Sequence, residues 1–138
     1  MKLTILGDIM AERPVLKAAK CRCGKYNFKG VFDPSRKLLS ESDYIIGNLE
    51  TPLAGEKAKY SQNHVCFNAP DEYVDAIMDA GIKLVSTVNN HSFDRGYAGM
   101  ERTIKVLDER VCPTPVHFYP APSGPRPTIL SRTAPSLL

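Results

Sequence analysis

Three apolar runs of this chain each end in polar residues of the types that bind metal ions or transfer protons. Residues 3–6 lead into Asp8, residues 44–46 lead into Asn48 and Glu50, and residues 84–88 lead into Asn89, Asn90 and His91. In an open α/β sheet, ligands bind in the crevice beyond the carboxyl ends of the strands. We therefore expect the three clusters to form one composite site.

The first two clusters hold carboxylates and an amide. An ionised Asp8 after a buried strand is costly unless it meets a cation or hydrogen-bond donors, so it is either a metal ligand or a cap of the next segment. Asn48 and Glu50 lie two residues apart, which places them on one side of the strand if it continues that far. Their oxygens suit a hard or borderline divalent ion, whereas the following Thr51-Pro52 equally fits a turn.

The third cluster, Asn89-Asn90-His91, is the sharpest local signal. His91 could ligate a metal, protonate a leaving oxygen or stabilise developing negative charge; the alternative is a polar turn. Asp94 lies three residues further on, and we expect it to hydrogen-bond the His91 ring and fix its tautomer. Arg95 either pairs with Asp94 or attracts an anionic substrate.

The elements that position these clusters alternate between strand and helix. Apolar runs predict strands at 2–6, 44–49 and 83–88, with a short extra strand at 65–67 and a polar loop at 51–63. The first strand is expected to be buried on both faces because its apolar run is nearly continuous. Alternation of this kind predicts an α/β fold with parallel strands.

Helices are predicted at 14–19, 33–42, 70–80 and 100–109. Asp33 is expected to cap the second, which would bury Leu38 and Leu39. The apolar stripe of the third comprises Tyr73, Val74, Ile77 and Met78, and Gly81 follows as its C-terminal cap. The fourth would bury Ile104 and Leu107.

Composition limits the classes of function. The 138 residues carry a formal charge of only +3 and no block of Lys or Arg, which gives no support to a nucleic-acid partner. Neither a membrane-length apolar run nor a signal peptide is found, so the chain as written is expected to be cytoplasmic. The four cysteines do not follow a zinc-binding spacing and are expected to be reduced thiols; His64 is expected at the surface.

Composition changes near residue 110. Residues 111–138 hold seven of the eleven prolines and no acidic residue, so they are expected to form an irregular tail. The chain thus divides into a body at 1–110 and a tail at 111–138.

The motifs at 7–10, 47–53 and 89–96 together resemble the bacterial capsule-synthesis proteins (CapA-like, poly-gamma-glutamate biosynthesis), within the calcineurin-like metallophosphoesterase superfamily. Residues 67–71 and 103–107 are also similar to that family. The resemblance covers 1–110 and implies the N-terminal half of a metallophosphoesterase-like β-sandwich flanked by helices, truncated. It ends where the family typically continues Gly-Val-Pro-His-Thr-Gly. A one-base shift of codons for those residues gives the observed Val-Cys-Pro-Thr-Pro-Val at 111–116, so we hypothesise that the tail is a frameshift product.

The resemblance implies that divalent metal ions, manganese, zinc or iron, are bound by Asp8, Asn48, Glu50, Asn90 and His91. His91 would also act on the leaving group, while Met10 stands where many relatives carry a histidine ligand. In such sites the ions activate water and neutralise phosphoryl oxygens.

The function expected is metal-dependent hydrolysis of an anionic phosphoester, or action on the capsule polymer, with the truncated chain itself inactive. Alternatives are a non-catalytic metal- or polymer-binding scaffold in capsule synthesis or export, and a plain α/β domain that binds no metal. Half a sandwich would leave apolar sheet surface uncovered and favour self-association. Capsule-synthesis proteins are often anchored outside the membrane.

Overall fold

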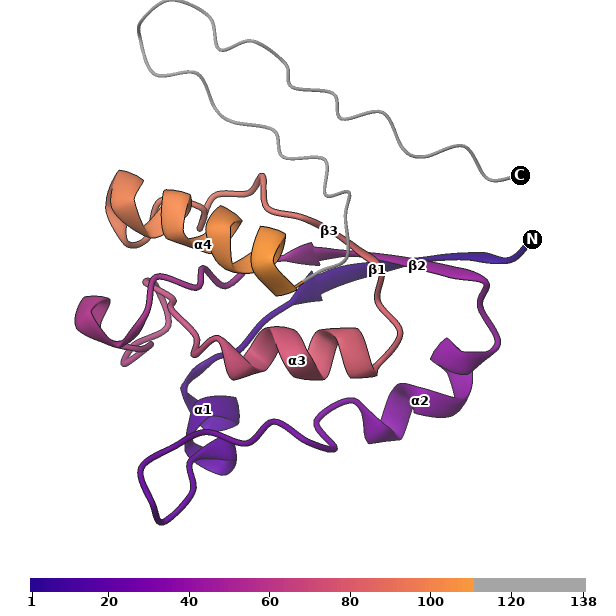
Figure 1. The fold of residues 1–138 in the computed structure, drawn as a ribbon, viewed down its shortest axis with the longest axis horizontal. Helices are drawn as coiled ribbons and strands as arrows, with labels where there is room; N and C mark the ends of the chain where they lie inside the picture. Colours follow the sequence, from indigo (N-terminus) through magenta and orange to yellow (C-terminus); the bar gives the residue numbers. More distant parts are fainter. Residues whose placement is uncertain (111–138) are drawn as a thin grey trace, which may run out of the picture.

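The computed structural model describes residues 1–110, so the expectations for 111–138, including Cys112 and the frameshift, lie outside the described residues. Figure 1 shows the elements in chain order: β1 (Leu3–Ile9), α1 (Arg13–Ala19), α2 (Asp33–Ser40), β2 (Tyr44–Leu49), the short 3-10 helix η1 (Glu56–Ala58), α3 (Glu72–Asp79), β3 (Leu84–Ser86) and α4 (Gly96–Arg110). None of the described helices is both long and apolar enough to span a membrane.

The strands form a three-stranded parallel sheet in the order β1-β2-β3. This confirms the predicted α/β class and the parallel strands. The described residues contain this one sheet, so the β-sandwich stays a prediction.

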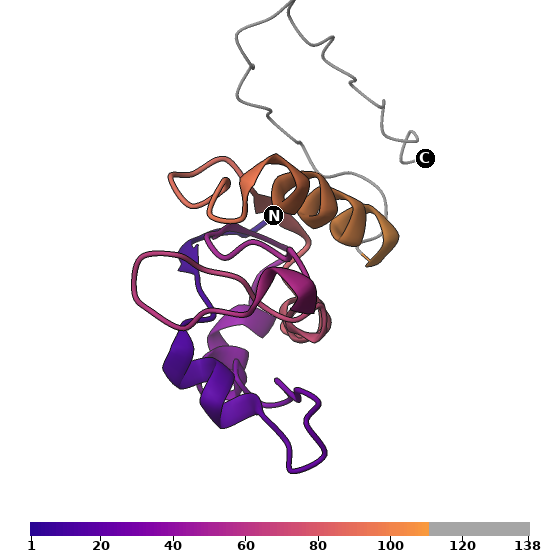
Figure 2. The same ribbon diagram turned by 90° about the vertical axis from the view of Figure 1, so that its left-hand side faces the viewer.

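One face of the sheet forms the core. Ile45 and Leu49 of β2 and Val85 of β3 are buried, together with Tyr73, Val74 and Ile77 of α3. In Figure 1, α1, α2 and α3 lie below the sheet and α4 lies near the carboxyl ends of the strands. Figure 2 shows α3 end-on beneath α4.

The opposite face of the sheet is open within the described residues. The prediction that the first strand is buried on both faces is therefore wrong. Leu3 is 47% exposed and Ile5 is 73% exposed. The run is nearly continuously apolar because one face packs on the core and the other also carries apolar residues, not because both faces are covered.

The helices largely follow the apolar pattern. Gly81 has φ +84° after α3, as expected of its C-terminal cap, and Ile104 and Leu107 of α4 are buried. Two details differ. Met78 is 40% exposed, and α2 buries Leu39 while leaving Leu38 64% exposed. Asp33 is the first helical residue rather than the cap, and Phe32 occupies the cap position without a capping side chain.

Two segments of irregular structure differ from expectation. Residues 65–67 do not form a strand. The Val65 and Cys66 N–H groups donate instead to the side chain of Asn63, which removes the donors that a strand would use. The predicted polar loop at 51–63 begins with five buried residues, 51–55, and contains η1. Cys21, Cys23 and Cys66 are free thiols, as predicted.

Candidate metal site

The first two clusters meet across neighbouring strands. Asp8 and Asn48 are register partners between β1 and β2, so their side chains lie on the same face of the sheet. The Asn48 Nδ2 donates to Asp8 Oδ1 at 2.8 Å and to Glu50 Oε2 at 2.5 Å. Asp8 is therefore part of β1 and does not cap the next segment. One amide holds two carboxylates that would otherwise repel each other.

Glu50 is the buried member of this group, with only 5% of its surface exposed. Its N–H donates to the carbonyl of Ile9 at 3.1 Å, which continues the β1–β2 pairing one residue beyond β2. This pairing aims the carboxylate back toward Asn48. The strand register thus fixes Asp8, Asn48 and Glu50 as a single unit.

Asn89 connects β2 to the third cluster. Its Nδ2 donates to Asn48 Oδ1 at 3.1 Å and to the carbonyl of Leu49 at 3.0 Å. Its Oδ1 accepts the N–H of His91 at 3.0 Å. The sequence analysis gave Asn89 no role of its own; the signal was its place directly after an apolar run and before two further polar residues.

His91 lies between two carboxylates. Its Nδ1 is 2.9 Å from Asp94 Oδ2, which confirms the predicted hydrogen bond, and its Nε2 is 3.8 Å from Glu50 Oε1. The second distance is too long for a hydrogen bond. A carboxylate acceptor at Nδ1 assigns the proton to that atom and leaves Nε2 free to act. The side chains of His91, Glu50 and Asp94 are 18%, 7% and 9% exposed.

Phe67 contacts both His91 and Asp94. The Phe67 ring packs against the imidazole with a centroid separation of 4.4 Å. The Phe67 N–H donates to Asp94 Oδ2 at 2.5 Å, so the oxygen that accepts from His91 also accepts from the backbone. These contacts hold Asp94 in place and fix the orientation of the ring.

Other candidates lie apart from this network. Asn90 is exposed, and within residues 1–110 its side chain makes no hydrogen bond to the cluster. His64 is at the surface, as predicted, and hydrogen-bonds Glu12 at 3.1 Å. Arg95 donates to the carbonyl of Asp94 at 3.1 Å rather than to its carboxylate.

The residues present fit a divalent cation chemically, although their arrangement is not that of a closed metal cage. Among the described residues, no group of three or more His, Cys, Asp or Glu side chains is already gathered to hold a metal. Asp8 and Glu50 nevertheless share one hydrogen-bond donor, and His91 Nε2 faces Glu50. Two carboxylates, an imidazole nitrogen and nearby amides make a donor set suited to such an ion.

The chain is similar to known capsule proteins. Residues 2–114 match the family described as "Bacterial capsule synthesis protein PGA_cap". Over 112 residues, 79% of this chain, it is 33% identical to the capsule biosynthesis protein CapA of Bacillus anthracis; over 105 residues, 75% of this chain, it is 27% identical to the PGA biosynthesis protein CapA of Bacillus subtilis (strain 168). The matches cover 26% and 27% of those proteins, so the chain spans about a quarter of their length. Because the family match extends over most of the sequence, the chain belongs to the bacterial capsule synthesis protein family PGA_cap.

Proposed function

We propose that this chain carries the metal-binding edge of a divalent-metal-dependent phosphoester hydrolase that acts in capsule (poly-gamma-glutamate) biosynthesis. The observation that supports this proposal is the network that joins Asp8, Asn48, Glu50 and His91 at the carboxyl ends of the strands. Family membership supports the link to capsule synthesis.

In this proposal Asp8 and Glu50 hold the cation, with the Nε2 of His91 as a further ligand. Asn48 orients the two carboxylates, and Asn90 would have to turn inward to add its amide oxygen. Bound divalent ions in such sites polarise phosphoryl oxygens and generate a nucleophilic hydroxide. Asp94 is a positioning residue, because it acts by keeping the proton of His91 on Nδ1. His91 then presents Nε2 toward the reacting group, where it can ligate the ion or transfer a proton.

Metal binding is tested by thermal melts of the full chain with and without Mn²⁺ or Zn²⁺. A metal that binds only the folded state adds about 2.7 kcal/mol at a hundredfold excess over its Kd, which raises the midpoint by several degrees. Glu50→Gln should abolish this rise. Glu101→Gln, the same change at an exposed position of α4, should retain it.

Turnover is tested separately with a generic phosphodiester and a full-length version of the protein, because the chain as written is expected to be inactive. Metal-dependent hydrolysis that is lost in Glu50→Gln and in His91→Ala supports the proposed enzyme. Metal binding without turnover in that version supports the non-catalytic metal-binding scaffold in its place, and the absence of any metal-dependent shift rejects both of these metal-dependent functions.

A further inference from the structure

Arg95 makes contacts that the proposed chemistry does not use. Its guanidinium donates to three backbone carbonyls, from Nε to Lys59 at 3.3 Å, from Nη1 to Asp94 at 3.1 Å and from Nη2 to Cys66 at 3.2 Å. The sequence analysis expected Arg95 either to pair with Asp94 or to attract an anionic substrate. The structure instead shows three of its five N–H donors on backbone oxygens.

The carbonyl of Cys66 belongs to the same peptide group as the N–H of Phe67. Arg95 holds this peptide group at its oxygen, whereas Asp94 holds it at its nitrogen, because the Phe67 N–H donates to Asp94 Oδ2 at 2.5 Å. Two consecutive residues therefore bind one peptide group from opposite sides. A peptide unit is planar, so a tilt at its oxygen also moves its N–H. The direction of the Phe67 N–H thus depends on Arg95.

The Phe67 N–H determines in turn where the carboxylate of Asp94 lies. Asp94 Oδ2 accepts from this N–H and lies 2.9 Å from His91 Nδ1, so the two groups share one oxygen. The Phe67 ring also packs on the imidazole, with the centroids 4.4 Å apart. A shift of the Phe67 peptide group would therefore disturb both the hydrogen bond and the packing of His91.

Neighbouring elements hold Arg95 in this position. Gly99 of α4 makes room for its stem, since a Cβ at Gly99 would lie only 2.5 Å from the Cβ of Arg95. The carbonyl of Lys59 also accepts from Nδ2 of the buried Asn68 at 3.1 Å. Lys59 is the one non-glycine residue with positive φ in the described chain, at +57°, and such conformations persist where the surroundings fix them. Both the stem of Arg95 and one of its acceptors are thus fixed.

We propose that Arg95 is a positioning residue for His91. By fixing the peptide group of Phe67, Arg95 keeps Asp94 Oδ2 on the Nδ1 proton of His91. The hydrogen bond at one ring nitrogen sets which nitrogen carries the proton, so Nε2 is left unprotonated and directed toward Glu50, 3.8 Å away. This inference rests on the proposed function only in giving Nε2 a task, because the tautomer of the ring can be measured without metal or substrate.

The test measures the tautomer of His91 by ¹⁵N NMR of the full chain at about pH 8, where an ordinary imidazole is neutral. His91→Gln identifies the signals of this ring by their loss. The wild type should carry the proton on Nδ1. In Arg95→Ala the population of the Nε2–H tautomer should rise about two- to tenfold, the change in an equilibrium that one hydrogen bond contributes.

Gly99→Ala is a second test that leaves Arg95 itself unchanged. The added Cβ displaces the stem of Arg95, so this variant should shift the His91 tautomer in the same direction. It also keeps the inference testable if Arg95→Ala does not fold.

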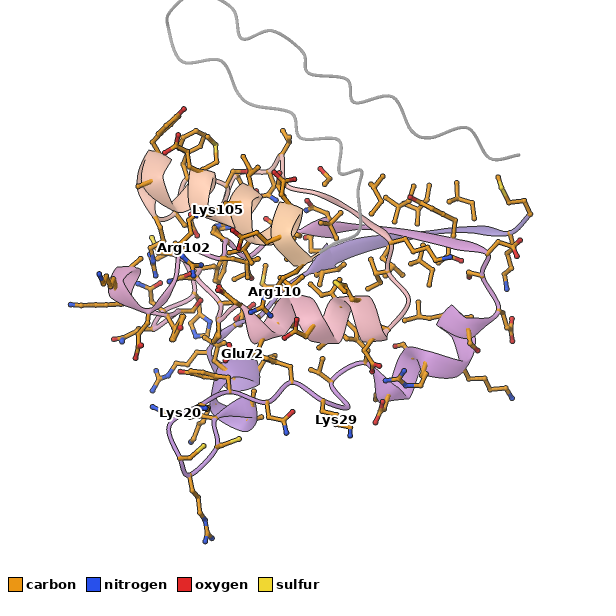
Figure 3. All side chains as sticks on the ribbon, viewed as in Figure 1. Lys20, Lys29, Glu72, Arg102, Lys105 and Arg110 are labelled. Atoms are coloured by element: carbon orange, nitrogen blue, oxygen red, sulfur yellow. The ribbon has the colours of Figure 1, made fainter. Side chains whose placement is uncertain are left out.

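Arg102→Ala is the matched control. It also removes an arginine that donates to a backbone carbonyl, that of Leu53, and its other hydrogen bonds go to Asp71. Figure 3 labels Arg102 on α4. This variant should lose stability and yet keep the wild-type tautomer of His91. His64, which hydrogen-bonds Glu12, serves as an internal control in every spectrum.

Three results would overturn the inference. They are a wild-type His91 with its proton on Nε2, a folded Arg95→Ala with an unchanged tautomer, and an equal shift in Arg102→Ala, which would show that lost stability alone moves the ring. Melts with Mn²⁺ separate this inference from the proposed function. If both hold, Arg95→Ala should raise the Kd for Mn²⁺ by up to about tenfold, as loss of an outer hydrogen-bond partner does. If the tautomer shifts but the wild type shows no metal response, the positioning role stands and the proposed function fails.

Discussion

The side chain of Asn48 allows the carboxylates of Asp8 and Glu50 to face each other without a cation. Its one Nδ2 group serves both Asp8 and Glu50, and its Oδ1 is occupied by Asn89. Every polar atom of this side chain is therefore used. An isosteric change that removes the donor would place three carboxylates together, which is unfavourable unless a cation neutralises them.

Asn48→Asp should therefore lower the free energy of unfolding in metal-free buffer by about 1–3 kcal/mol, the cost of an unsatisfied group in a partly buried network. Added Mn²⁺ should restore part of this loss, and urea unfolding with and without metal measures both effects. Asn27→Asp is the matched control. Asn27 is exposed and uses only its Oδ1, as acceptor of the Lys29 N–H, which an aspartate retains. Equal losses in the two variants would contradict the role given to Asn48.

Tyr73 makes stability depend on alkaline pH. Burial raises the pKa of its phenol above the ordinary value near 10. The folded state keeps the proton that the unfolded state releases, so this contribution to stability is complete below about pH 10 and is lost as the pH rises toward the folded pKa. Between pH 9 and 11 the wild type should lose about 1.4 kcal/mol more than Tyr73→Phe, measured by urea unfolding. Identical pH dependence in the two proteins would show that Tyr73 ionises as easily when folded.

At the scale of elements, two arginines fix α4 against α3. Arg102 donates from Nη1 and Nη2 to the two carboxylate oxygens of Asp71, each at 2.8 Å, and from Nη1 to the carbonyl of Leu53. Hydrogen bonding to Asp71 raises the pKa of Arg102. Arg110 binds Asp75 of α3 at 2.6 Å. Figure 3 labels Arg102 and Arg110 on α4, with Arg110 close to α3.

Arg102→Ala should cost about 1–2 kcal/mol of unfolding free energy, since it removes a bidentate pair and leaves the carbonyl of Leu53 without this donor. Arg102→Lys keeps the positive charge but cannot make the bidentate pair with Asp71, so it should recover only part of the lost stability. Arg36→Ala provides the comparison, because Arg36 makes similar ion pairs with Asp33 and Asp79 at solvent-exposed positions. It should cost less than Arg102→Ala does, because solvent screens exposed ion pairs. Chemical denaturation ranks the three variants, and an Arg36→Ala cost as large as that of Arg102→Ala would reject this explanation.

The elements that sequence analysis predicted well are those whose apolar spacing coincides with burial. β2, α3 and α4 are of this kind. β1 shows the limit of such reasoning, because Ile5 has the same side chain whether or not a second layer covers it. The missed turn at 65–67 has a different cause: a side chain, Asn63, takes the backbone donors, and this competition leaves no apolar pattern.

The site was predictable for a related reason. Parallel strands bring their carboxyl ends together, so Asp8, Glu50, Asn90 and His91 were expected to meet. Asn48 joins Asp8 to Glu50, and Asn89 connects Asn48 to the backbone of His91. The sequence did not indicate whether Asn89 or Asn90 would turn its side chain toward Asn48. That choice depends on the turn after β3, where Asn89 accepts the His91 N–H and Asn90 is left exposed.

At the scale of the whole molecule, the dominant feature is the face of the sheet that residues 1–110 leave uncovered. Register pairs Leu3 with Tyr44, Ile5 with Ile46, and Ile46 with Leu84, so apolar residues of all three strands share this face. β1 is also an edge strand of the sheet that the described residues form, with unpaired backbone groups along one side. An apolar face beside an open edge favours association of two copies.

We therefore expect the full chain to self-associate with increasing concentration through this face, which sedimentation velocity would detect. Ile5→Lys should shift the distribution toward monomer while leaving the melting temperature of the monomer nearly unchanged, because Ile5 is 73% exposed and contributes little to the core. Leu38→Lys introduces the same charge at a position of α2 that is 64% exposed and away from the sheet. It should leave the association intact. If both variants became equally monomeric, net charge rather than the open face would govern association, and the sheet would have to be covered in some other way.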